Sequence, residues 1–198
     1  MNSRPARGIL SPELRAIRER MRAAAPEARA IAGGLSDEQC SERPAPGRWS
    51  IAECIDHLNV VGEKLIRAID PAIERAHREG RYASGPFRYG RLGAWFVRSA
   101  SGEPRARRRR YRTFSVYAPR RVLAIERVLA DFKTLQDNLV ERVEAAGGLN
   151  LARIKVTSPA ARWVRLSLGL WLEMLAGHQE RHLAQARDVR EQLFGAAE

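Results

Sequence analysis

The sequence predicts an all-α protein, a four-helix bundle with a long crossover between its second and third helices. Four segments of bundle length carry apolar residues at the three- and four-residue spacing of helices. No segment shows a sustained strand-like alternation bounded by turn signals. With 198 residues, 44% of them hydrophobic and 29% charged, the chain fits one domain spanning residues 1–198.

The first two helices have recognisable starts. A Ser-Pro pair at residues 11–12 provides a cap and a first-turn proline, so a helix is expected over residues 11–33. Ser50 is followed three residues later by Glu53, which is the capping-box arrangement. The second helix therefore begins at this serine, and its apolar stripe predicts an end near Gly80.

The second half of the chain predicts an irregular connection and two more helices. Residues 81–119 are interrupted by several Gly and Pro residues and are read as a basic crossover. The third helix is expected from about 119 to 146, where a Gly pair follows. The fourth is expected from Ser158-Pro159 to about Phe194.

The net charge of +12 favours anionic partners, but its origin is mostly compositional. Only three of the 35 basic residues are lysines, a bias typical of a GC-rich genome, which enriches arginine everywhere. One run in the crossover is unusually dense: Arg105, Arg107, Arg108, Arg109, Arg110 and Arg112. This run is read as a solvated or substrate-steering loop, and nucleic-acid binding through phosphate contacts remains the alternative.

Cysteine content and hydropathy point to the cytoplasm. Cys40 and Cys54 are too few for a disulfide framework. The N-terminus has no apolar signal-peptide core, and no stretch reaches the ~20 apolar residues that span a bilayer. We therefore expect a cytoplasmic protein with no membrane segment.

Three of the four histidines are expected to face the bundle interior. His178 and His182 fall in the middle of the apolar arc of the fourth helix, and His57 flanks the inward stripe of the second. The i, i+4 spacing of the first two places their Cβ atoms ~5–6 Å apart on one face, which suits chelation of one metal ion. His77 lies among charged residues and is assigned to the surface.

Packing alone is the competing interpretation of these histidines. A buried imidazole is often a core residue bonded to a carbonyl, and His-x-x-x-His pairs occur in helices by chance. However, each unsatisfied buried nitrogen costs ~1–3 kcal/mol, so three histidines in one core favour a metal site.

Two segments resemble a known family. Residues 47–58, which read Gly-Arg-Trp-Ser-Ile-Ala-Glu-Cys-Ile-Asp-His-Leu, resemble the second-helix signature of the DinB/YfiT-like superfamily of metal-dependent enzymes. Residues 177–185, Gly-His-Gln-Glu-Arg-His-Leu-Ala-Gln, resemble its fourth-helix signature. The resemblance implies a four-helix bundle in which His57, His178 and His182 hold a divalent metal. It also implies a homodimer, and relatives include transferases and isomerases that use low-molecular-weight thiols.

A three-histidine site leaves at least one coordination position for water or substrate, as in catalytic sites. Zn²⁺ is the expected metal, with Ni²⁺ or Fe²⁺ also compatible with imidazole. The expected function is a metal-dependent enzyme acting on a small, anionic molecule, either a thiol-dependent transferase or a hydrolase. A basic nucleic-acid-binding or structural protein, with histidines that only pack the core, is the alternative.

Neighbouring residues have candidate supporting roles. Glu53, Glu180 and Gln185 flank the histidines, so each is a candidate to accept a proton from a ligand imidazole, and the two carboxylates are candidate bases. The helix cap is the competing role for the first. Cys54 is read as a small buried apolar residue, ahead of a fourth ligand or reactive thiol. Trp171 either lines the pocket or packs in the core.

Overall fold

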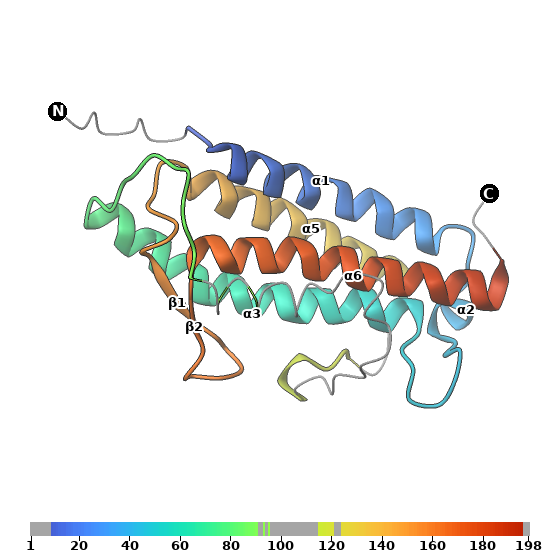
Figure 1. Ribbon diagram of the computed structural model, residues 1–198. Coiled ribbons are helices and arrows are strands. Elements are labelled where there is room, and N and C mark those ends of the chain that lie inside the picture. The colour runs from blue at the N-terminus through green and yellow to red at the C-terminus, as the bar shows by residue number, and fades with distance from the viewer. Residues whose placement is uncertain (1–8, 91–92, 94, 96–114, 121–123, 196–198) are drawn as a thin grey trace.

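The computed structural model describes residues 9–90, 93, 95, 115–120 and 124–195, and within them four long helices form a bundle (Figure 1). The prediction of an all-α bundle is confirmed. The four helices are α1 (Pro12–Ala32), α3 (Ile51–Arg78), α5 (Ile125–Ala145) and α6 (Leu168–Phe194). In Figure 1, α1 and α5 form one side of the bundle, and α6 and α3 form the other.

The two predicted helix starts are present. The Ser11 hydroxyl accepts a hydrogen bond from the Leu14 backbone N–H at 3.2 Å, directly before α1. At α3, the Ser50 hydroxyl accepts from the Glu53 N–H, and the Glu53 carboxylate accepts from the Ser50 N–H at 2.9 Å. Both halves of the capping box therefore fix where α3 begins, and with it the positions of all later residues on that helix.

The third long helix begins later than predicted, at Ile125 rather than near Pro119. Ala124, its N-cap residue, has no side chain that can cap. Instead, Asp37 accepts the Ile125 N–H at 2.8 Å. Asp37 begins a short unpredicted helix, α2 (Asp37–Ser41), so a residue 88 positions earlier in the chain provides this cap.

The fourth helix also begins later than predicted, at Leu168 rather than after Pro159. The preceding residues form two short antiparallel strands, β1 (Lys155–Thr157) and β2 (Arg165–Ser167), in which Val156 lies opposite Leu166. Neither strand was predicted from the sequence, and two strands of three residues leave the all-α class unchanged. Three-residue strands are too short to show the alternation that identifies a strand in a sequence.

Helices α3 and α5 run in the same direction. Near the start of both helices, the Asn59 amide donates to the Val128 carbonyl, and near their ends His77 contacts the Ala145 carbonyl. Two parallel neighbours need a connection that returns along the bundle, which explains the long crossover. Of this crossover, the 3₁₀ turn η2 (Ser115–Tyr117) and residues 118–120 are described at its end.

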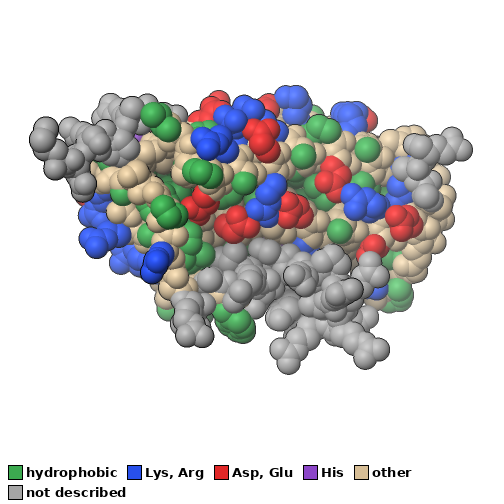
Figure 2. Space-filling view, turned by 45° about the horizontal axis from the view of Figure 1, so that its top comes forward, with side chains coloured by type: hydrophobic (Ala, Val, Ile, Leu, Met, Phe, Trp, Pro, Cys, Tyr) green, Lys and Arg blue, Asp and Glu red, His purple; other side chains and the backbone are tan. Residues whose placement is uncertain are grey.

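Charges on the described surface are mixed rather than separated. Figure 2 shows basic and acidic side chains interspersed over the middle of one face. Many form ion pairs between helices. For example, Arg20 Nε of α1 lies 2.6 Å from Glu180 Oε1 of α6. None of the described helices combines the length and apolar character that crossing a bilayer requires.

Candidate metal centre

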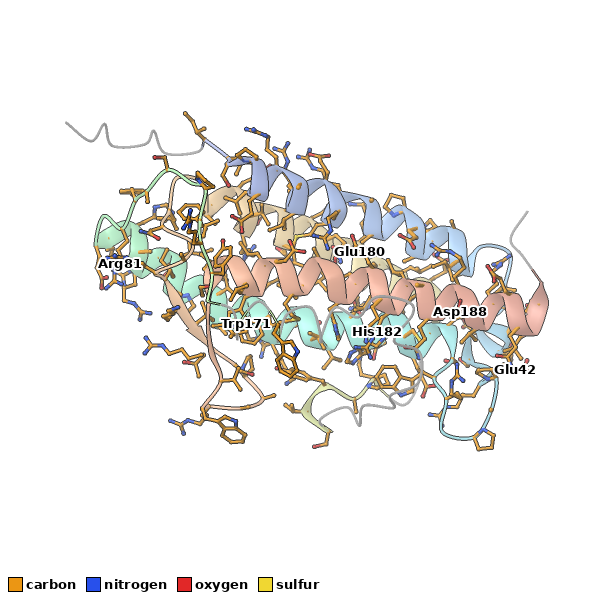
Figure 3. The ribbon with its side chains drawn as sticks, viewed as in Figure 1. Glu42, Arg81, Trp171, Glu180, His182 and Asp188 are labelled. Atoms are coloured by element: carbon orange, nitrogen blue, oxygen red, sulfur yellow. The ribbon has the colours of Figure 1, made fainter. Side chains whose placement is uncertain are left out.

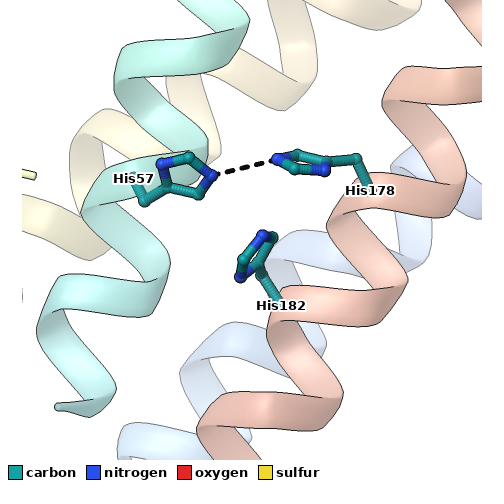
Figure 4. A group of neighbouring side chains, drawn as sticks. All are labelled: His57, His178 and His182. Atoms are coloured by element: carbon teal, nitrogen blue, oxygen red, sulfur yellow. Dashed lines mark hydrogen bonds between the residues drawn. The ribbon is translucent and has the colours of Figure 1, made fainter. Parts of the chain in front are cut away.

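The structure brings His57 of α3 together with His178 and His182 of α6 (Figure 4). One ring nitrogen from each of the three side chains lies within 4.8 Å of the others. His57 and His182 are buried, at 3% and 4% exposure, whereas His178 is half-buried. The cluster therefore lies near the surface of the α3–α6 interface, with one imidazole partly open to solvent.

Hydrogen bonds to the ring nitrogens set the tautomers of two of these histidines. The Nδ1–H of His57 donates to the Tyr117 carbonyl at 2.7 Å, and that of His182 donates to Gln185 Oε1 at 3.1 Å. Each Nε2 then carries a lone pair, because a neutral imidazole has one donor and one acceptor nitrogen. Metal-ligating histidines characteristically use their second nitrogen in this way.

His57 and His178 point their Nε2 atoms at one another, 3.0 Å apart (Figure 4). Since the Nε2 of His57 is an acceptor, the Nε2–H of His178 donates to it. A proton therefore lies between the Nε2 atoms of His57 and His178, at a position where a metal cation can replace it. The three imidazoles, from two helices, are close enough to hold one metal ion.

Burial favours the neutral forms of His57 and His182. It lowers the pKa of His57, and a backbone hydrogen bond to Tyr117 opposes this only in part. Burial also lowers the pKa of His182 well below its ordinary value, and the cationic forms of His178 and His57 would lower it further. Neutral rings are what metal ligation requires, because a protonated imidazole has no lone pair to offer.

Trp49 packs against the cluster, a contact that the sequence analysis did not assign to it. Its ring centroid lies 4.7 Å from that of His57 and 5.7 Å from that of His182. The half-buried indole covers these two rings and limits their contact with water. Its place directly before the Ser50 cap, two turns ahead of His57, was the available signal.

The two candidate carboxylates have other partners. Glu53 is held in the capping box and by an ion pair with Arg43. Glu180 pairs with Arg20 of α1, and in Figure 3 it lies on the opposite side of α6 from His182. Two residues of separation place side chains about 200° apart around a helix.

The other candidate residues have structural positions. Trp171 is buried and donates its indole N–H to the Val156 carbonyl at 3.0 Å, which attaches the hairpin to α6. Cys54 is fully buried, burial raises the pKa of its thiol, and it is not among the residues whose ligand atoms converge. His77 is half-buried at the far end of α3 beside Tyr82. The predicted steering residues Arg105, Arg107, Arg108, Arg109 and Arg110 lie outside the described residues.

A pair of charged residues beside the cluster was also missed. Asp56, adjacent to His57, is fully buried and forms an ion pair with Arg120. An acidic residue inside the apolar run of α3 was the only signal in the sequence, and its partner lies 64 residues away.

Comparison with known proteins agrees with this architecture. The model of the DinB superfamily matches residues 19–186, a span that contains the three histidines and all four long helices in whole or in part. No curated protein and no solved structure gives a significant match. Because the match covers most of its length, the chain belongs to the DinB superfamily.

Proposed function

We propose that the protein is a metal-dependent enzyme in which His57, His178 and His182 hold one divalent cation, with Zn²⁺ the first candidate and Ni²⁺ or Fe²⁺ compatible. The observation that carries this proposal is that three ring nitrogens, from two helices, lie within 4.8 Å of one another. The other ring nitrogens of His57 and His182 are hydrogen-bonded to oxygen atoms. A hydrogen bond accounts for the approach of His57 to His178, but not for the third ring nitrogen that His182 brings to the same point. Three protein ligands leave room for a water molecule or a substrate.

The resemblance to thiol-dependent relatives favours transfer of a low-molecular-weight thiol to a small electrophile, with hydrolysis as the second candidate. When bound, a divalent cation supplies the Lewis acid that acidifies a thiol or a water molecule. The protein contributes the other requirements. Half-buried His178 gives access from solvent, and the Trp49 indole shields the rings of His57 and His182.

An anionic substrate is the second part of the proposal. Arg110, the last arginine of the proposed steering group, precedes Tyr117 by seven residues, and the Tyr117 carbonyl contacts His57. A basic segment that lies only a few residues before Tyr117 in the sequence would favour the approach of anions.

Homodimerisation and a cytoplasmic location complete the proposal. Both cysteines are buried as free thiols, as expected in a reducing compartment. The family provides the argument for the dimer. Light scattering coupled to gel filtration distinguishes a dimer of 22.3 kDa chains from a monomer.

Elemental analysis of untagged protein tests the metal site. Wild-type protein should carry close to one divalent ion per chain, and His182→Ala should lose it. His77→Ala is the matched control, because this histidine lies at the other end of α3 and should leave the metal content unchanged. If wild-type protein contains no metal and takes up neither Zn²⁺ nor Ni²⁺ on titration, the proposed function is wrong.

A further inference from the structure

Two consecutive residues of α3 hold the two ends of the same short segment of the crossover. His57 donates from Nδ1 to the Tyr117 carbonyl at 2.7 Å. Asp56 accepts the backbone N–H of Arg120 at 2.7 Å and its guanidinium Nε–H at 2.7 Å. Residues 117–120 are therefore attached to α3 at both ends, directly beside the candidate metal centre.

The Asp56 carboxylate depends on this segment for its partners. It is fully buried, and a buried carboxylate is stable only when its charge is paired and hydrogen-bonded. Arg120 donates two guanidinium N–H groups to Asp56 Oδ1 and its backbone N–H to Oδ2, so both the side chain and the main chain of Arg120 are fixed. Arg120 also lies 3.4 Å from Asp131 of α5, so the segment is tied to a second helix.

We infer that Asp56 and Arg120 are positioning residues for the metal centre: their ion pair holds the Tyr117 carbonyl against His57 Nδ1. This contact keeps the proton on Nδ1 and directs the Nε2 lone pair toward His178 and His182. The inference rests on the proposed function, because the lone pair is useful only if the three histidines bind a cation. It assigns the end of the crossover a part in building the site.

Removal of Arg120 separates positioning from simple electrostatics. Arg120→Ala removes a positive charge and leaves the carboxylate of Asp56 close to the histidines. Coulombic attraction alone would then tighten the binding of a divalent cation. Loss of positioning would weaken it, and outer partners of metal-ligating histidines typically change metal affinity 10–100-fold.

The test uses full-length protein in two states. In metal-free, ¹⁵N-histidine-labelled protein, NMR reports which His57 nitrogen carries the proton. We expect Nδ1–H in wild type and a mixture of tautomers in Arg120→Ala. Titration with Zn²⁺ alone should then show 10–100-fold weaker binding in the variant. Arg120→Lys keeps the positive charge but loses the guanidinium, so its Zn²⁺ affinity should lie between those of wild type and Arg120→Ala.

Arg142→Ala is the matched control. Arg142 of α5 forms a bidentate pair with Asp70 of α3, at 3.0 and 3.1 Å, far along α3 from His57. The variant Arg142→Ala should lower the melting temperature and leave both the His57 tautomer and the Zn²⁺ affinity unchanged. If Arg120→Ala does not fold, the comparison is made with Arg120→Lys.

The outcomes separate this inference from the proposed function. Unchanged or tighter Zn²⁺ binding in the Arg120 variants, with Nδ1–H retained, would overturn the inference and leave the metal site standing. A wild-type protein that contains no metal and binds neither Zn²⁺ nor Ni²⁺ would overturn the proposed function, and the inferred role in metal binding with it. The tautomer in metal-free protein would then still show whether the pair positions the ring.

Discussion

Metal binding should stabilise the wild-type fold and should not stabilise His178→Ala. A ligand that binds only the folded state, at a free concentration 100 times its Kd, adds about 2.7 kcal/mol to the free energy of unfolding. For a chain of 198 residues, each kcal/mol raises the melting temperature by about 2–4 °C, so the expected rise is about 5–11 °C. The measurement is a thermal melt followed by circular dichroism, in chelator and in buffered Zn²⁺.

The variant is chosen because its metal-free cost is small. His178 is half-buried, so truncating it removes less packing than at buried His182. Truncation also removes its hydrogen bond to His57, worth about 1 kcal/mol. In chelator the variant should therefore melt a few degrees below wild type, and Zn²⁺ should not raise its melting temperature. The reasoning is refuted if Zn²⁺ does not change the melting temperature of wild-type protein. It is also refuted if Zn²⁺ raises the melting temperature of His178→Ala as much as it raises that of wild type and of the control His77→Ala.

Three further predictions concern the scaffold. Trp171→Phe removes the indole N–H that donates to the Val156 carbonyl. It should lower the free energy of unfolding by about 1 kcal/mol, as measured by chemical denaturation. Gly169→Ala would place a Cβ 1.9 Å from the Tyr89 hydroxyl, so it should lower the melting temperature despite the better helix propensity of alanine. Burial acts to raise the pKa of Glu53, but hydrogen bonds from Arg43 and Ser50 outweigh it and hold this pKa below 4.5. Its stabilisation is therefore present above pH 4.5 and lost as the pH falls through the lowered value, so Glu53→Gln should flatten the loss of stability as the pH falls below 4.5.

The parts of the fold that could be predicted are those encoded locally. The capping box at Ser50 and the apolar stripe that follows it involve residues only a few positions apart, so α3 begins where predicted. The start of α5 was misplaced because its cap is Asp37, a contact distant in the sequence. The β1–β2 hairpin was missed because its strands have three residues each.

The same distinction applies to the candidate site. The three histidines could be assigned to one interior region because helical spacing fixes the direction of each side chain relative to the apolar stripe. Asp56 could not be assigned to this region from the sequence, since helical geometry places it on the side of the helix away from the apolar stripe. It is buried because the chain near Arg120 covers it. The Tyr117 carbonyl is a backbone group that any residue would supply, so no residue type could indicate it.

The topology of the bundle explains why the crossover contributes to the site. Because α3 and α5 are parallel, the chain must return from the end of α3 to the level of its start before α5 can begin. His57 lies two turns inside that start, and the returning chain reaches it at Tyr117, a few residues before α5. An up-down connection between these helices would be short and would leave His57 Nδ1 without this carbonyl. The parallel pair therefore determines both the length of the crossover and the second hydrogen bond of a candidate metal ligand.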